Sequence, residues 1–157
     1  MEIILLSVGK ATTKWIVQGI EEYEKRLRRY IKFTSKSVPD IKKGSSIDQT
    51  RQKEEEGKSL LGEITDSDYV VLLDEKGKEF TSVSFSRQLE KLMSSGRKRL
   101  VFVVGGPYGF SEKVYERSDA LISLSQMTFT HEMVRLFFTE QVYRGMTIIR
   151  GEPYHHV

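Results

Sequence analysis

Residues 99–109 read RLVFVVGGPYG, an apolar run that ends in a loop of three glycines and a proline. The run from Arg99 to Val104 is rich in β-branched and aromatic side chains, which is typical of a strand buried on both faces. A glycine pair after such a strand allows backbone or a ligand to approach closely, because no Cβ intervenes. The stretch therefore predicts a parallel α/β sheet with either a tight turn or a ligand site at the carboxyl end of this strand.

Extended and helical patterns alternate along the rest of the chain. Further strands are predicted at Glu2–Val8, Phe33–Val38, Tyr69–Asp74 (closed by a turn at Glu75–Lys78) and Ala120–Leu124. Helices are predicted around residues 16–30, at 47–64, from a Ser82 cap to Met93, briefly from Ser111, and from a Thr130 cap to about residue 145, with a loop at 42–46. The order predicts one α/β domain over residues 1–157, with a mainly parallel sheet flanked by helices. The last helix is apolar on more than one face, so it is either deeply buried or shared with a second subunit.

Composition excludes several classes of protein. The chain has 157 residues, 38% of them hydrophobic, and no cysteine, which rules out disulfides, thiolate metal sites and thiol nucleophiles. It contains no apolar run long enough to span a membrane. The N-terminus lacks a basic leader and is expected to be a strand and not a signal peptide. We expect a cytoplasmic protein without a membrane partner.

Charge is distributed unevenly along the sequence. The net charge is only +3, from 25 basic and 22 acidic residues, yet eight Lys or Arg between Lys25 and Lys43 face a single acid, Asp40. Such a run is either a solvated helix face followed by a loop or a patch for an anionic partner such as nucleic acid. Charge alone leaves both interpretations open.

Common catalytic motifs are missing. Glycines at 105, 106 and 109 do not match the dinucleotide fingerprint, and neither a phosphate-binding Gly-Lys-Ser/Thr nor a Gly-x-Ser-x-Gly elbow is present. The histidines His131, His155 and His156 are spaced poorly for zinc, so no metal is expected. His131 is expected to be a surface or capping residue. The aromatic tail from Tyr154 onward is expected to be docked.

Six segments, read in order, resemble the SPOUT-class methyltransferases, and most closely the ribosomal RNA large-subunit methyltransferase H family. They are Val8-Gly9-Lys10, residues 22–27, Leu73-Asp74 with Gly77-Lys78, residues 105–109, residues 123–129, and residues 140–144 through 153–155. The resemblance covers essentially the whole chain and departs from the family pattern at Tyr108. It implies a C-terminal trefoil knot and a homodimer with the active site between subunits.

The resemblance also implies an activity, which is S-adenosylmethionine-dependent methylation of N3 of a pseudouridine in 23S rRNA, on the assembled ribosome. The residues implied for the cofactor are Leu73, Gly106, Ser125, Gln126, Met127, Thr128, Phe129 and Thr130. Catalytic candidates are Arg144, Tyr154 and His155, with His155 expected to accept the imide proton or, alternatively, to stack on the base or contact phosphate. The RNA-binding candidates are Lys25, Arg26, Lys42, Lys43 and Arg135.

Two other functions fit the same patterns. A catalytically silent RNA-binding or ribosome-assembly factor could have the same fold, and a flavodoxin-like nucleotide-binding protein would match the coarse order of strands and helices. The strand-end loops favour the methyltransferase over the silent factor, because a silent factor has no need of a glycine there. Uptake of S-adenosylmethionine separates these two.

Overall fold

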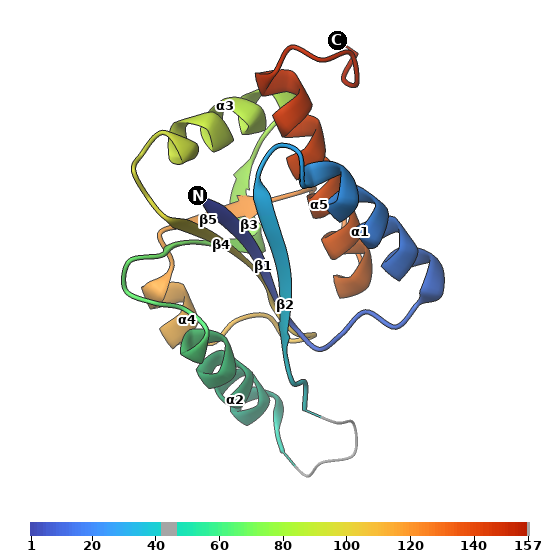
Figure 1. Cartoon of the computed structure of the whole chain (residues 1–157). Coiled ribbons are helices and arrows are strands. Elements are labelled where there is room, and N and C mark those ends of the chain that lie inside the picture. The colour runs from blue at the N-terminus through green and yellow to red at the C-terminus, as the bar shows by residue number, and fades with distance from the viewer. Residues whose placement is uncertain (42–46, 157) are drawn as a thin grey trace.

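Five parallel strands form the centre of the protein in the computed structural model, which describes residues 1–41 and 47–156 (Figure 1). Across the sheet the order is β2 (Lys32–Val38), β1 (Glu2–Val8), β4 (Arg99–Val104), β3 (Tyr69–Glu79) and β5 (Ala120–Ser123). Every neighbouring pair is parallel, so the α/β fold with a mainly parallel sheet is confirmed. The loop expected at 42–46 lies outside the described residues.

Helices cover both faces of this sheet. The face that carries Ile3 and Leu5 of β1 packs against α1 (Lys14–Leu27), α3 (Ser82–Met93) and α5 (His131–Ile149). The opposite face, with Ile4 and Leu6, packs against α2 (Gln49–Gly62) and α4 (Glu112–Arg117). Successive side chains of a strand point to opposite faces, which explains why β1 and β4 are apolar at nearly every position. No helix within the described ranges is long and apolar enough to cross a membrane.

Helix α5 lies between α1 and α3 against the sheet. Phe138, Val142 and Met146 are buried in the core, and Phe138 packs against Phe102 of β4 with ring centroids 4.6 Å apart. The α1–α5 contact is close at Gly19, where a Cβ would come within 2.8 Å of Leu136. The apolar character of α5 thus follows largely from burial within one chain.

The turn predicted at Glu75–Lys78 is wrong, because β3 continues to Glu79. Leu73 and Lys78 both pair with Ile122 of β5, so the intervening residues leave the regular ladder and the strand then pairs again. Gly77 makes this possible, since a Cβ there would lie 2.5 Å from backbone atoms of Ile122. A polar segment with a glycine is typical of turns, but here the glycine permits close contact between strands. Leu73 pairs with Val104, the last residue of β4, so Asp74 lies just beyond the end of that strand.

Helix caps agree with the sequence in part. The Oγ1 atom of Thr130 accepts a hydrogen bond from the backbone N–H of Met133, as expected for the start of α5. The cap of α3 is Thr81 and not Ser82, since Thr81 Oγ1 accepts from the N–H of Ser84 at 3.1 Å. Ser111 occupies the cap position of α4. These caps mark where the loops after β3, β4 and β5 end and where α3, α4 and α5 begin.

Gly77→Ala is expected to lower the free energy of unfolding by about 1–3 kcal/mol, because the added methyl group would force β3 away from the backbone of β5. Urea denaturation followed by circular dichroism measures the change. Gly62→Ala in α2 is the matched control, since nothing lies within 4 Å of a Cβ at that position. Equal stability of the two variants would contradict the close contact.

Candidate functional site

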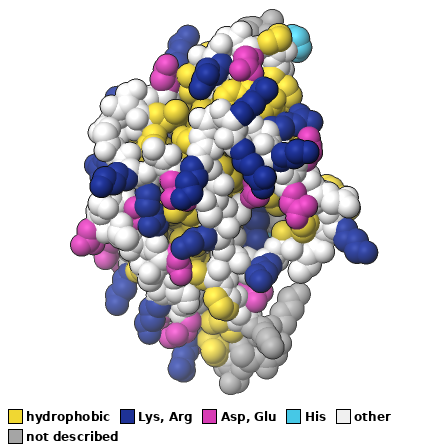
Figure 2. All heavy atoms as spheres, in the orientation of Figure 1, with side chains coloured by type: hydrophobic (Ala, Val, Ile, Leu, Met, Phe, Trp, Pro, Cys, Tyr) yellow, Lys and Arg dark blue, Asp and Glu magenta, His cyan; other side chains and the backbone are white. Residues whose placement is uncertain are grey.

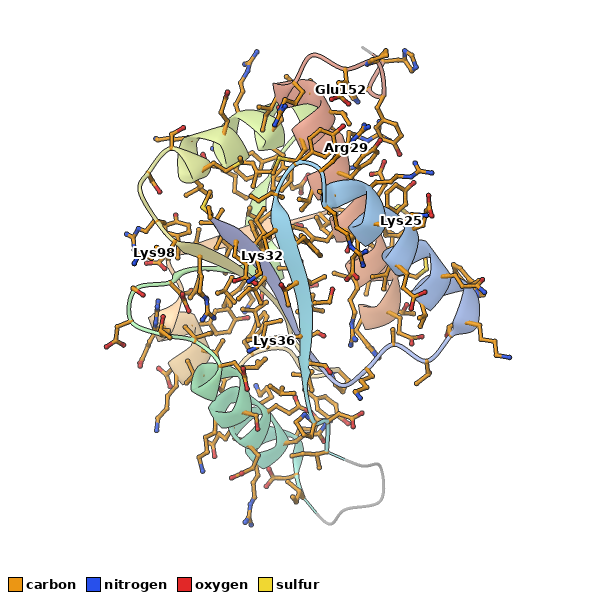
Figure 3. The ribbon with its side chains drawn as sticks, in the orientation of Figure 1. Lys25, Arg29, Lys32, Lys36, Lys98 and Glu152 are labelled. Carbon is orange, nitrogen blue, oxygen red and sulfur yellow. The ribbon has the colours of Figure 1, made fainter. Side chains whose placement is uncertain are left out.

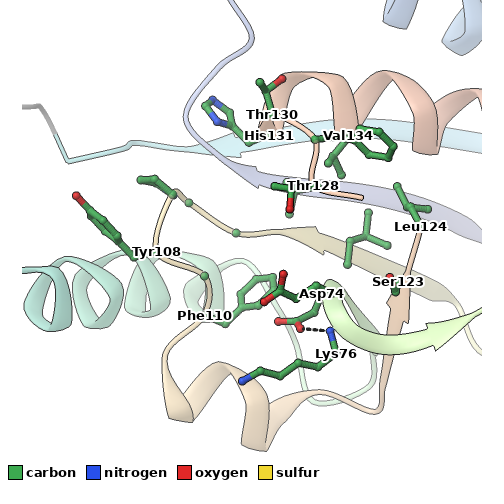
Figure 4. A pocket seen from close by; sticks show the side chains of 18 of the residues that line it. Asp74, Lys76, Tyr108, Phe110, Ser123, Leu124, Thr128, Thr130, His131 and Val134 are labelled. Carbon is green, nitrogen blue, oxygen red and sulfur yellow. Dashed lines mark hydrogen bonds between the residues drawn. The ribbon is translucent and has the colours of Figure 1, made fainter. Parts of the chain in front are cut away.

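A cavity of about 750 Å³ opens at the carboxyl ends of β3, β4 and β5 (Figure 4). Three strand-end loops line it: Leu73–Lys76, residues 104–110 and residues 123–131. Every residue expected to hold the cofactor lies in its wall, namely Leu73, Gly106, Ser125, Gln126, Met127, Thr128, Phe129 and Thr130. Segments that are far apart in the sequence therefore meet in one cavity, at the place where ligands bind in open α/β sheets.

The chemistry of the wall fits the methyl donor that the resemblance implies. Leu73, Leu124 and Val134 offer apolar surface for an adenine ring, and the backbone of residues 125–130 offers polar groups for its edge. The carboxylates of Asp74 and Glu75 line the same cavity together with Lys53 and Lys76, so the wall offers partners for both the positive and the negative groups of a zwitterionic ligand. A site with mixed walls of this kind can hold an amphipathic ligand.

Asp74 is held in place by two neighbours that sequence reasoning missed. The backbone N–H of Lys76 donates to Asp74 Oδ1 at 2.8 Å (Figure 4). The hydroxyl of Tyr115 on α4 donates to Asp74 Oδ2. Burial, and secondarily this hydrogen bond, raise the pKa of Tyr115, so its hydroxyl stays protonated and donating. The position of Asp74 after a buried strand was a usable signal, whereas nothing in the sequence pointed to Tyr115.

The glycine loop forms a tight turn, as one interpretation of the glycine pair predicts, and it also lines the cavity. The N–H of Gly109 donates to the carbonyl of Gly106 at 3.1 Å, with Pro107 and Tyr108 between them. Gly109 has a φ of 81°, a conformation that other residues rarely adopt. His131, expected as a surface or capping residue, lies on the rim of the cavity in the first turn of α5 (Figure 4).

The three catalytic candidates form a second cluster, centred on Glu140 of α5. Tyr154 donates its hydroxyl to Glu140 Oε1 at 3.0 Å, and Arg144 donates to the same oxygen at 2.5 Å. Arg144 also approaches Nδ1 of His155 at 3.2 Å, and its guanidinium lies 4.8 Å from the centre of the Tyr154 ring. Burial, together with hydrogen bonds to Tyr23 and Glu140, raises the pKa of Tyr154. The tail is docked by this cluster.

This cluster and the cavity lie at opposite ends of α5. His131 and Val134 are in the cavity wall and Arg144 follows thirteen and ten residues later, which corresponds to about 15–20 Å along a helix. The structure therefore brings the expected cofactor residues together and the expected catalytic residues together, but it separates the two groups within one chain.

Arg135, expected to contact RNA phosphate, has a different position. Its side chain is buried, and its guanidinium donates to the carbonyl oxygens of Val8 and Gly9, each at 2.9 Å. Those bonds connect α5 to the end of β1. Because the group is enclosed and already bonded, we leave Arg135 out of the RNA-contacting set.

The basic stretch is less positive in space than in sequence. Ion pairs join Arg26 to Glu22, Arg29 to Glu152, Lys32 to Glu2 and Lys36 to Glu63. Figure 3 shows Arg29 beside Glu152, and Figure 2 shows acidic side chains among the basic ones on this face. Lys25 is exposed and forms no such pair within the described residues, while Lys42 and Lys43 lie outside them. Within the described ranges, no group of acidic or histidine side chains is arranged to hold a metal ion.

Comparison with known proteins identifies the family. The family model described as "Predicted SPOUT methyltransferase" matches residues 1–155, and the chain belongs to this SPOUT methyltransferase family. Similar proteins named ribosomal RNA large subunit methyltransferase H come from Christiangramia forsetii (54% identical), Flavobacterium psychrophilum (55%) and Parabacteroides distasonis (54%). Each comparison spans 156 residues and 99% of both chains.

Glu140→Ala is expected to release the tail, because Tyr154 and Arg144 would both lose their shared acceptor. Amide hydrogen exchange in residues 152–156 should become at least several times faster. Glu90→Ala, an exposed position on α3, is the control and should leave tail exchange unchanged. Unaltered exchange in the Glu140 variant would show that other contacts hold the tail.

Proposed function

We propose that this protein transfers a methyl group from S-adenosylmethionine to N3 of a pseudouridine in 23S rRNA, on the assembled ribosome in the cytoplasm. The observation that carries the proposal is the convergence of the three strand-end loops on one cavity. The names of the similar proteins, which describe methyltransferases of large-subunit ribosomal RNA, support the choice of substrate. A C-terminal trefoil knot, expected for the family, is part of the proposal.

In the cavity, Leu73 and Leu124 would contact the adenine ring while residues 125–130 bind its edge. S-adenosylmethionine supplies an electrophilic methyl group on a positively charged sulfur. Asp74, fixed by Tyr115 and the N–H of Lys76, would favour that positive charge. Holding donor and acceptor in line is the main contribution of such a site, since positioning converts an encounter between molecules into a step within one complex.

On the acceptor side, the geometry favours a donor role for His155. An arginine can only donate, so Nδ1 of His155 must accept from Arg144, and the neutral ring then carries its proton on Nε2. A ring in this state has no free nitrogen with which to accept the imide proton. In this tautomer His155 would contribute by donating Nε2–H to the base, and the proton-acceptor role expected from the sequence would require Arg144 to release Nδ1.

The remaining tail groups are also donors. Tyr154, with its raised pKa, keeps its proton and donates to Glu140, and Arg144 remains positively charged. Removal of the N3 proton leaves a negative charge shared with the adjoining carbonyl oxygens. Arg144 and His155 would stabilise that anion by hydrogen bonding, which lowers the pKa of the imide and lets a water molecule carry the proton away.

A second copy of the chain would complete the site, because Arg144, which contacts the tail, lies about 15–20 Å along α5 from the residues of that helix that line the cavity. Apolar side chains near the cavity are left exposed, with Met127 at 76%, Phe129 at 36% and Phe137 at 37%. Exposed apolar groups of this kind are typical of interfaces. We propose a homodimer in which the tail of one subunit completes the cavity of the other.

Binding to ribosomal RNA would rely on exposed cations. Lys25 and Arg26 lie at the exposed end of α1, and Lys42 and Lys43 follow in the sequence. Neutralised phosphates supply much of the affinity for nucleic acid, so binding should weaken as salt rises. Ion pairs already occupy several neighbouring cations, which indicates that shape recognition of the ribosome contributes as well.

The first test combines cofactor binding with turnover. Calorimetric titration should show one S-adenosylmethionine bound per cavity, and ribosomes lacking the methyl group should gain a single methyl on a pseudouridine, read by mass spectrometry of 23S rRNA. Cofactor binding without methyl transfer to any ribosomal substrate would favour a silent assembly factor.

The second test mixes two inactive variants. His155→Ala should bind cofactor normally and lose at least tenfold in turnover, since the anion loses a donor. Thr128→Trp, which fills the cavity, should abolish cofactor binding. Mixed dimers should regain part of the activity, because one site then combines an intact cavity with an intact tail. Absence of any recovery in verified mixed dimers would contradict the shared site.

A further inference from the structure

Glu56 is a buried carboxyl group on the far side of the glycine loop from the cavity. It belongs to the acidic run Glu54–Glu56 of α2, yet Glu54 is exposed whereas Glu56 is only 2% exposed. Successive residues of a helix lie on different faces, so Glu56 faces the core while Glu54 faces solvent. Carboxylates are almost never fully buried unless they are paired, which makes this position unusual.

The pairing of Glu56 is incomplete. The amide of Gln52, one turn earlier, donates to Oε1 at 3.0 Å. The other oxygen, Oε2, is enclosed and has no hydrogen-bond partner within the described part of the chain. Burial raises the pKa of this carboxyl. An enclosed oxygen without a partner is destabilising, and an apolar side chain of similar size would avoid the penalty. Burial in the core alone therefore does not explain why a polar side chain occupies this position.

What Glu56 contacts is the start of the glycine loop. A Cβ at Gly106 would lie 2.4 Å from Oε2, 3.0 Å from Cδ and 3.1 Å from Oε1 of Glu56. The whole carboxyl group thus lies against the α-carbon of Gly106, and no larger residue fits between them without displacing it. Gly106 lines the cavity, whereas Glu56 does not.

A second glycine keeps α2 in position for this contact. At Gly57 a Cβ would lie 2.4 Å from Oγ of Ser111 and 3.2 Å from Val114, so α2 packs tightly on α4. Ser111 begins the helix that follows the glycine loop. Adjacent residues of α2 therefore contact both ends of the segment between β4 and α4, with Glu56 at its start and Gly57 at its end.

We propose that Glu56 is the positioning residue of the cofactor loop, a carboxyl that supports Gly106 from behind and sets the shape of the cavity wall for S-adenosylmethionine. This inference rests on the proposed function. The glycine at 106 serves this contact: its missing side chain makes room for Glu56, in addition to any approach of the cofactor from the cavity. A loop held in shape before binding loses less conformational entropy when the ligand arrives.

A double-mutant cycle on the full-length protein tests the contact, with the dissociation constant of S-adenosylmethionine measured by calorimetry. Glu56→Ala should weaken binding about tenfold, and Gly106→Ala should weaken it by a similar factor in the wild-type background. Added to Glu56→Ala, the Gly106→Ala change should cost less than threefold more, because the methyl group then has space. Multiplication of the two single effects would overturn the proposal.

Conservative and control variants separate positioning from general destabilisation. Glu56→Gln keeps the shape of the side chain and should restore binding to within about threefold of wild type. Glu54→Ala, on the exposed face of the same helix, should change nothing. At saturating cofactor, Glu56→Ala should recover most of its turnover with ribosomes, so that KM for the cofactor rises while kcat changes little.

The outcomes distinguish this proposal from the one on which it rests. A wild-type protein that binds no S-adenosylmethionine would refute the proposed function itself. Normal binding by the wild type together with unchanged binding by Glu56→Ala would refute only the role of Glu56. Equal losses in Glu56→Gln and Glu56→Ala would also refute it, because the shape of the carboxyl would then not matter. Melting temperatures measured alongside show whether each variant is folded under the conditions of binding.

Discussion

The attachment of α5 to the end of β1 is the interaction on which the rest of the structure depends. Arg135 donates to the carbonyl oxygens of Val8 and Gly9, and Glu132 accepts from the backbone N–H and hydroxyl of Thr13. These bonds satisfy backbone groups at a strand end where the sheet offers no partner. They also fix the start of α5, whose N-cap Thr130 ends the loop formed by residues 124–130. The cavity wall has its shape because α5 begins where it does.

The opposite end of α5 follows a different principle, since it is organised by one carboxylate. Glu140 accepts from Tyr154 and Arg144, and Arg144 in turn lies within hydrogen-bond distance of Nδ1 of His155. Each group is oriented by a neighbour that is itself held by hydrogen bonds. The result is a tail whose polar groups are ordered by hydrogen bonds to one another.

Sequence reasoning predicted the elements whose hydrophobic periodicity matches their burial. It failed where contacts between distant segments determine the local structure. The apolar runs of β1 and β4 and the Thr130 cap follow from local patterns, and so does the convergence of three strand ends on one edge of a parallel sheet. The residues after Leu73 were misjudged, because the fit of Gly77 against Ile122 depends on a strand almost fifty residues away. Arg135 was misjudged because a basic residue on a helix gives no local sign of burial.

The family resemblance contributed what local patterns could not. The residues Arg144, Tyr154 and His155 do meet in space, but nothing in their spacing reveals Glu140 as the common acceptor of Arg144 and Tyr154. Glu56 was equally hidden, since one acid of three in a polar helix has no distinguishing mark. Glu140 contacts Arg144 and Tyr154, and Glu56 contacts Gly106, all of which the sequence did suggest. The two carboxylates themselves are recognised only from the arrangement in space.

A single unbroken helix connects the cavity wall to the tail, so its residue count couples two distant surfaces in both distance and angle. Inserting one residue in the middle of α5 would advance the tail by about 1.5 Å and rotate it by about 100°. An insertion of about seven residues restores the angle, but it moves the tail by two turns. Substitutions leave the length of this helix unchanged, whereas insertions alter it. We therefore expect insertions and deletions in the family to occur in surface loops far more often than within α5.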